Sequence, residues 1–164
     1  MQLRRPTRAD KKTVMEMMQE FQDMQSLHDG GFWSPDNFLY EEWLETNRLM
    51  EAGLQIPENF VPSIQFVAFD ARDRAIGFLN LRLALNASLQ KEGGHIGYSV
   101  RPSKRGRGFA KKMLAAGLKE ARTKNIQTVL LTCKVHNEAS RSVILANGGI
   151  LEDIQGETER YFIR

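Results

Sequence analysis

The chain has 164 residues, of which 41% are hydrophobic and 26% charged, a size and composition that exclude a disordered or fibrous chain and predict one domain over residues 1–164. The formal net charge is only +3, but six Lys and Arg side chains lie between Arg101 and Lys112 with no acid among them, which leaves −3 for the rest of the chain. A basic block this local predicts an anion-binding site.

The N-terminal segment predicts a short strand followed by a helix. Residues 3–6 favour a strand, and Thr7 followed three residues later by Asp10 is typical of a helix N-cap. The helix is expected to pack on the core through apolar residues at helical spacing, which are Val14, Met17, Met18, Phe21 and Met24.

A second helix is expected to begin at Ser34-Pro35-Asp36, after a break at Gly30-Gly31. Its acids, between Asp36 and Glu51, are expected to face solvent, and contact with a cationic substrate is the less favoured interpretation. Its apolar residues are Leu39, Tyr40, Trp43, Leu44 and Met50.

The middle of the chain predicts three strands. Residues 64–69 are rich in β-branched and aromatic side chains, residues 70–73 form a turn, and residues 75–85 are expected to return as the second strand of a hairpin. A glycine pair then precedes a third strand over residues 95–100.

The C-terminal part predicts a crossover and a hairpin. A helix over residues 109–121 followed by a buried strand over residues 128–133 gives a right-handed connection between parallel neighbours. A short helix over 138–147 and two strands, 150–154 and 160–163, complete the chain. The order indicates an α/β (α+β) fold, a mixed sheet with helices around it.

Other features exclude several classes of protein. The single cysteine, Cys133, cannot form an internal disulfide or a multi-cysteine zinc site, and no His or carboxylate spacing indicates a metal. No window approaches the about 18 apolar residues of a membrane span, and the N-terminus lacks the apolar stretch of a signal peptide. We expect a cytoplasmic protein with no metal and no membrane partner.

The basic block lies in a loop between a strand and a helix. There Gly106 and Gly108 would let the backbone close around an anion, the helix N-terminus offers unpaired N–H groups, and Arg105 and Arg107 add charge. The loop lacks the Gly-Lys-Ser/Thr ending of a P-loop, and Lys111 stands where a dinucleotide fingerprint has its third glycine. The sequence therefore favours neither a P-loop nucleotide site nor a dinucleotide-binding site.

The pattern Arg105-x-x-Gly108-x-Ala110 directly after a strand resembles the acetyl-CoA pyrophosphate loop of the GNAT family of N-acetyltransferases. A second stretch, from Asn137 to Gly149, resembles the family's other motif, and the run from His95 to Arg101-Pro resembles a bacterial branch of predicted acetyltransferases. The resemblance implies a mixed central sheet of about six to seven strands with splayed central parallel strands, flanked by about four helices.

The resemblance also implies how acetyl-CoA, as co-substrate, would bind. The backbone of Tyr98, Ser99 and Val100 would pair with the pantetheine arm almost as an added strand, and Asn137 would bind the arm or order its loop. Backbone N–H groups of the loop would hold the pyrophosphate, from Arg105, Gly106, Arg107, Gly108, Phe109 and Ala110.

The implied reaction is direct attack of a neutral amine on the thioester, which needs a route for the amine's proton. His95 is the first candidate base, because an unperturbed imidazole titrates near neutrality; Glu92 is the second, and a water relay stays open. Many members place a general-acid Tyr where this chain has Ile144, so Tyr98 is considered as a substitute, with a core or pantetheine-packing role as the favoured interpretation. Members that acetylate ribosomal proteins often carry Glu where this chain has Thr132.

We therefore expect an acetyl-CoA-dependent N-acetyltransferase acting on a primary amine of a small molecule, peptide or protein. One alternative is a GNAT-fold sensor that binds acyl-CoA without turnover, and a less favoured one is a nucleic-acid binder that uses residues 101–112. By analogy the acceptor would be bound by residues 24–62, which carry no motif. The edge of the C-terminal strands is a candidate surface for a homodimer.

Overall fold

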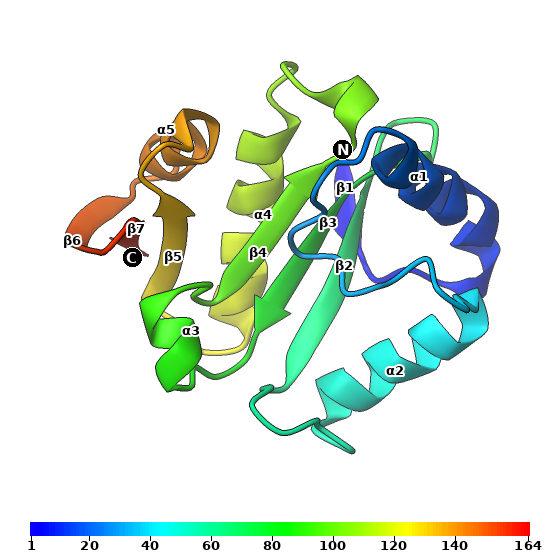
Figure 1. Ribbon diagram of the computed structural model, residues 1–164, viewed down its shortest axis with the longest axis horizontal. Helices are drawn as coiled ribbons and strands as arrows, with labels where there is room; N and C mark the ends of the chain where they lie inside the picture. Colours follow the sequence, from blue (N-terminus) through cyan, green and yellow to red (C-terminus); the bar gives the residue numbers. More distant parts are fainter.

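The computed structural model describes residues 1–164 as seven strands and five α-helices, with two short 3-10 helices (Figure 1). The strands are β1 (Gln2–Arg4), β2 (Ser63–Phe69), β3 (Ala75–Arg82), β4 (Ile96–Val100), β5 (Val129–Lys134), β6 (Ile150–Gln155) and β7 (Thr158–Ile163). The helices are α1 (Lys11–Asp23), α2 (Tyr40–Ala52), α3 (Ala87–Lys91), α4 (Phe109–Thr123) and α5 (Glu138–Ala146), and the 3-10 turns are η1 (Arg8–Asp10) and η2 (Pro102–Lys104).

The strands form two sheets that meet at β4 and β5. One sheet has the order β1-β2-β3-β4 and the other β5-β7-β6, and every pairing within them is antiparallel. β4 and β5 point the same way (Figure 1), yet no strand pairing joins them. A backbone hydrogen bond from His95 N–H to Leu130 O, 2.8 Å long, links the starts of the two strands. Beyond that bond the strands diverge, which is the splay that the resemblance implies.

Two apolar clusters cover the two faces of the four-stranded sheet. On one face, α4 packs through Met113, Leu114 and Leu118 against side chains of β2 and β3 such as Phe66 and Leu79. On the other face, α1 and α2 pack against the remaining side chains of these strands, in a cluster that contains Val14, Met17, Phe21, Tyr40, Trp43, Val67 and Phe78. Because alternate residues of a strand point to opposite faces, β2 and β3 are buried on both sides.

The first helix follows the prediction at its start and departs from it at its end. Thr7 and Asp10 form the predicted capping box, and the apolar stripe is buried from Val14 to Phe21. Met24, however, is 64% exposed, because α1 ends at Asp23. Its assignment to the core was wrong.

The second helix begins later than predicted. The Ser34-Pro35-Asp36 signal is used in a turn, where Asp36 N–H donates to Ser34 Oγ and Asn37 adopts a left-handed φ of 53°. The helix then begins at Tyr40, and Leu39, which was predicted to lie within it, stands at its N-cap and is 56% exposed. The acids of α2 do face outward, as expected: Glu41 pairs with Lys11 and Glu45 with Arg48.

The connection between β3 and β4 also differs from the prediction. β3 ends at Arg82 rather than at residue 85, and after a short loop the chain forms α3 from Ala87. Asn86 caps this helix by accepting the Leu89 N–H at 2.9 Å. With this short helix the protein has five α-helices, one more than the number of about four that was expected.

Candidate functional site

The gap between β4 and β5 exposes main-chain hydrogen-bonding groups. Arg101 N–H donates to Ile76 O at 2.8 Å, and Arg82 N–H donates to His95 O at 2.7 Å. Bonded and non-bonded pairs alternate along an antiparallel ladder, so Ser99 is bonded to β3 while the N–H and C=O of Tyr98 and Val100 point toward β5. Since β5 does not pair with β4, these groups can bind an extended amide-containing chain laid in the gap, apart from Val100 O, which accepts Arg105 Nε.

A row of free backbone N–H groups lies beyond the end of this gap. From Gly106 through Lys111 they donate to no acceptor in the protein, because they belong to the loop and the first turn of α4. Gly106 and Gly108 have φ values of +74° and +79°, and a Cβ built on either would meet no atom within 4 Å. The loop is therefore open, with its donors available to an anion.

The cations of this loop lack acidic partners. Arg101 forms an ion pair with Glu20, but no other cation of the block forms one, namely Lys104, Arg105, Arg107, Lys111 and Lys112. An uncompensated positive charge beside six free N–H donors, those of residues 106–111, fits a pyrophosphate.

Arg105 takes a different position from its neighbours. Its Nε donates to Val100 O at 2.9 Å and its Nη2 to Ser26 Oγ at 2.7 Å, so the side chain folds back over the end of β4. Its own N–H closes a turn on Pro102 O at 3.3 Å. In this conformation Arg105 shapes the loop, whereas Arg107 is exposed and makes no hydrogen bond.

Glu20 of α1 anchors the start of the loop. Its carboxylate accepts Ser103 N–H and Ser103 Oγ–H, each at 2.9 Å, and Arg101 Nε at 3.0 Å. Partial burial works against the charged form, but these bonds outweigh it and hold the pKa of Glu20 below its ordinary value. The loop is therefore fastened to a helix about 80 residues earlier in the chain.

Asn137 and Tyr98 meet at the N-terminus of α5. Asn137 Oδ1 caps this helix by accepting Ser140 N–H at 3.1 Å, which is the loop-ordering alternative of the two roles considered. The Tyr98 hydroxyl lies 3.1 Å from Ser140 Oγ, across the gap from β4. Burial raises the pKa of Tyr98 to about 12, so the phenol keeps its proton at neutral pH. Ile144 is fully buried one turn further along α5.

The ring nitrogen of His95 that could accept a proton is already hydrogen-bonded within the protein. Its Nδ1 accepts Leu130 N–H at 2.9 Å, so the neutral ring carries its proton on Nε2. Burial and the nearby charge of Arg82 lower the pKa of His95. A neutral imidazole in this tautomer is a donor at Nε2, and the contact therefore argues against His95 as the proton acceptor.

Glu92, the second candidate base, also has a partner. Its carboxylate forms a 2.7 Å ion pair with Lys134, and its side chain is 59% exposed.

Cys133 is a poor nucleophile, because burial and the adjacent Glu159 raise the pKa of its thiol to about 11. Within the protein no group of three or more His, Cys, Asp or Glu side chains could hold a metal ion. No helix combines the length and apolarity that crossing a membrane requires.

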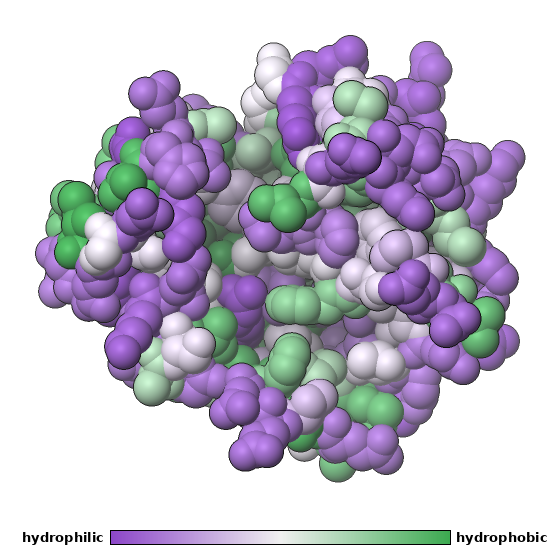
Figure 2. All heavy atoms as spheres, in the orientation of Figure 1, coloured by the Kyte–Doolittle hydropathy of each residue, from purple (hydrophilic) through white to green (hydrophobic).

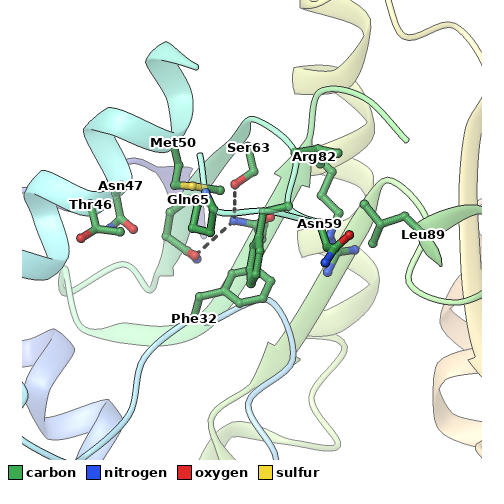
Figure 3. A pocket seen from close by; sticks show the side chains of 13 residues that line it. Phe32, Thr46, Asn47, Met50, Asn59, Ser63, Gln65, Arg82 and Leu89 are labelled. Atoms are coloured by element: carbon green, nitrogen blue, oxygen red, sulfur yellow. Dashed lines mark hydrogen bonds between the residues drawn. The ribbon is translucent and has the colours of Figure 1, made fainter. Parts of the chain in front are cut away.

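A cavity of about 230 Å³ opens between α2, β2 and β3 on the face opposite α4. Figure 2 shows this side of the molecule hollowed near its centre, with hydrophobic and hydrophilic residues around the hollow. In Figure 3, Thr46, Asn47 and Met50 of α2 lie at one end of the cavity, and Asn59, Arg82 and Leu89 lie at the other. The segment 24–62, to which the analogy assigns acceptor binding, contributes several lining residues, and strands β2 and β3 contribute others.

The polar floor of this cavity was not predicted from the sequence. Gln65 Nε2 donates to Gly30 O at 2.6 Å, and Asn80 Nδ2 donates to Gln65 Oε1 and Ser63 Oγ, each at 3.3 Å. These three residues are at least 95% buried. The available signal was the spacing of Ser63-x-Gln65 and Asn80-x-Arg82, which puts polar side chains on one face of otherwise apolar strands.

Comparisons with known proteins agree with this geometry. A family profile described as "Acetyltransferase (GNAT) domain" matches residues 1–150. A search of curated protein sequences finds no match.

Several solved structures share the fold. The spermidine N-acetyltransferase from Vibrio cholerae in complex with CoA and spermine is 20% identical, with a TM-score of 0.62, over 99% of this chain and 94% of that one. The ribosomal-protein-S5-alanine acetyltransferase from Vibrio fischeri is 18% identical, with a TM-score of 0.67, over 98% and 89%. The GNAT domain of S. lividans PAT is 16% identical, with a TM-score of 0.64, over 98% and 88%. The profile match over most of the chain and the splayed fold lead to one conclusion: the protein belongs to the GNAT acetyltransferase family.

Proposed function

We propose that the protein transfers the acetyl group of acetyl-CoA to a primary amine. The observation that carries this proposal is the row of free N–H donors from Gly106 through Lys111 at the end of a gap edged by the unpaired backbone of Tyr98. A pyrophosphate on the loop and a pantetheine arm along β4 would satisfy both sets of groups together. The thioester would then lie near the start of the gap, where His95 and Leu130 hold the strands together.

The proposed reaction proceeds without a covalent enzyme intermediate. The amine nitrogen attacks the thioester carbonyl carbon and forms the C–N bond, the C–S bond breaks, the amine loses one proton and the departing thiolate gains one. The N–H groups of β4 that face the gap would stabilise the oxyanion. Tyr98 is the proposed donor in the last step, because its hydroxyl carries a proton at neutral pH, although the burial that raises its pKa makes the phenol a weaker acid.

We propose that water removes the proton of the attacking amine. Of the side-chain candidates, His95 uses Nδ1 to accept Leu130 N–H, and Glu92 is paired with Lys134 at the surface. A water relay needs neither contact to break.

The test combines binding with turnover. Acetyl-CoA should raise the melting temperature, and CoA release should depend on an added amine from a panel of polyamines, amino acids and peptides. Stabilisation without CoA release from any amine would support the sensor alternative. No shift with acetyl-CoA, together with salt-sensitive binding of oligonucleotides, would support the nucleic-acid alternative and overturn the proposal.

A further inference from the structure

The cavity beside α2 has an unusual charge distribution for a site that receives an amine. Its lining contains no Asp or Glu, and Arg82 is its single ionisable side chain. Of the four acids of α2, none lines the cavity, and Glu41, Glu45 and Glu51 are paired with Lys11, Arg48 and Arg5. A polyamine with several positive charges would find no carboxylate inside this cavity.

Arg82 is held in place with part of its guanidinium unused. Its Nη1 donates to Gly93 O and Gly94 O at 3.0 and 3.1 Å, while Nε and Nη2 have no hydrogen-bond partner. Arg82 forms no ion pair; burial lowers its pKa, and the nearby charge of Asp29, which makes no ion pair with it, acts in the opposite direction. A partly buried guanidinium without an anionic partner is costly, and its planar fork matches a carboxylate.

The buried polar atoms of the cavity include free donors as well as a free acceptor. Asn80, which is 2% exposed, has an Oδ1 without a partner, and the buried Nδ2 of Asn47 is also unpartnered. Ser63 Oγ accepts from Asn80, so its own proton is free to donate. The cavity therefore offers free donors on Arg82, Ser63 and Asn47, and Asn80 Oδ1 is the one acceptor among its fully buried side-chain atoms without a partner.

Arg82 also lies close to the start of the gap. Its backbone pairs with His95, and a Cβ built on Gly97 would be 3.3 Å from Arg82 Nη2. Asn80 faces Gly97 directly across the ladder. An anionic group bound to Arg82 would thus be only a few bonds away from an amine placed at β4.

We propose that this cavity binds an acceptor of the amino-acid class, a small zwitterion whose carboxylate pairs with Arg82 while its amine lies beside β4. The proposal rests on the proposed function, since it names the acceptor for that transfer. The volume of about 230 Å³ supports a small acceptor, because it falls below the about 300 to 1,000 Å³ of typical ligand sites.

The decisive measurement compares each acid with its own amide. The acceptors are the twenty standard L-amino acids, the corresponding amino-acid amides, which keep the amine but lose the carboxylate, and spermidine. We expect at least one free amino acid to be acetylated with a kcat/KM about 10- to 100-fold above that of its amide, the range of a hydrogen bond to a charged group. Preference for amides or for spermidine overturns the proposal and leaves acetyl transfer intact.

Variants locate the effect at Arg82. R82Q should bring the acid-to-amide ratio close to one, and R82K, which keeps the charge but loses the fork, should give an intermediate ratio. R122Q is the matched control, because Arg122 also donates to a backbone carbonyl, that of Arg164, but belongs to α4 across the sheet. A folding defect lowers both rates and preserves the ratio, so an unchanged ratio in R82Q contradicts the proposal.

Binding gives a readout that does not depend on turnover. In the presence of CoA, the preferred amino acid should raise the melting temperature of the wild-type protein and not that of R82Q. If no amino acid shifts the melting temperature or releases CoA, the proposal fails. If acetyl-CoA itself does not bind, the proposed function fails, whereas stabilisation by amino acids without CoA release would contradict only the transfer.

Discussion

The backbone N–H of Leu130 donates to Nδ1 of His95 over 2.9 Å, while His95 N–H donates to Leu130 O over 2.8 Å. The two residues therefore exchange hydrogen bonds as a strand pair would, with an imidazole in place of one carbonyl. This pair stands where β4 and β5 begin to diverge, so the ring nitrogen helps to fix the closed end of the gap.

His95→Asn should retain kcat and its pH profile, because an amide oxygen can take the place of Nδ1 as acceptor for Leu130 N–H but cannot act as a base near neutrality. His95→Ala should lower the free energy of unfolding by about 1 to 3 kcal/mol, since it leaves that N–H unpaired. Steady-state rates from pH 6 to 10 and urea unfolding measure the two effects. A loss of the same limb of the pH profile in both variants would restore His95 as the base.

Gly108→Ala should weaken acetyl-CoA binding. Gly108 has a φ of +79° with open space above it, so alanine would strain the backbone by about 1 to 2 kcal/mol and put a methyl group where phosphate oxygens must approach. Gly156→Ala is the matched control, because Gly156 also has positive φ (+62°) and an open Cβ direction, but lies in the β6–β7 turn. Calorimetric titration should show a Kd at least about tenfold higher for the first variant only, about 1.4 kcal/mol.

Tyr98→Phe should lower kcat by about 100-fold if the hydroxyl protonates the thiolate, and should leave KM nearly unchanged. Ser140→Ala removes the partner of that hydroxyl at 3.1 Å but keeps the phenol and its proton, so it should cost less than about tenfold. Because the pKa of Tyr98 is about 12, neither the wild type nor the Ser140→Ala variant should lose activity to ionisation of this phenol below pH 10. Equal kcat for the phenylalanine variant and the wild type would remove Tyr98 from the reaction.

Asp10→Asn should destabilise the protein at neutral pH but not in strong acid. Hydrogen bonds from Arg4, at 2.7 and 2.9 Å, and from Thr7 hold the pKa of Asp10 below its ordinary value of 3.8. The unfolded chain therefore takes up a proton near that value while the folded chain stays charged, so this stabilisation is complete above pH 3.8 and is lost as the pH falls through the folded pKa.

At pH 7 the loss should be about 1 to 3 kcal/mol, and thermal or urea unfolding at pH 7 and pH 2 measures how it shrinks. Glu45→Gln provides the comparison, because its pair with Arg48 is at the surface and should change stability little at either pH. A pH-independent deficit would show that the charge of Asp10 is not the cause.

Local signals predicted the elements that depend on local interactions. The capping pair Thr7 and Asp10, the turn at Asp70 and the left-handed glycines of the basic loop all act within a few residues of chain. The start of α2 was misplaced because Ser34-Pro35-Asp36 fits a turn as well as a helix N-terminus, and the choice depends on how Tyr40 and Trp43 pack on the sheet.

The candidate site also has one part that local sequence signals predict and one part that they do not. The anion loop was predictable, since adjacent glycines and arginines form it. The cavity was not predictable, because it joins α2, the segment before β2, two strands and α3. In the sequence, each of its polar strand residues looks only like an interruption of an apolar strand. The engagement of His95 by Leu130 depends on two strands that meet 35 residues apart.

The three hydrogen bonds that Glu20 accepts from Ser103 and Arg101 have a consequence for protein engineering. Exchanging α1 and α2 for those of another family member is an obvious way to change acceptor preference, and it would delete this carboxylate. Such a chimera would also release the loop from Ser103 onward, to which we propose the pyrophosphate of acetyl-CoA binds, so its rates would mix two defects. A graft that retains Glu20 separates them.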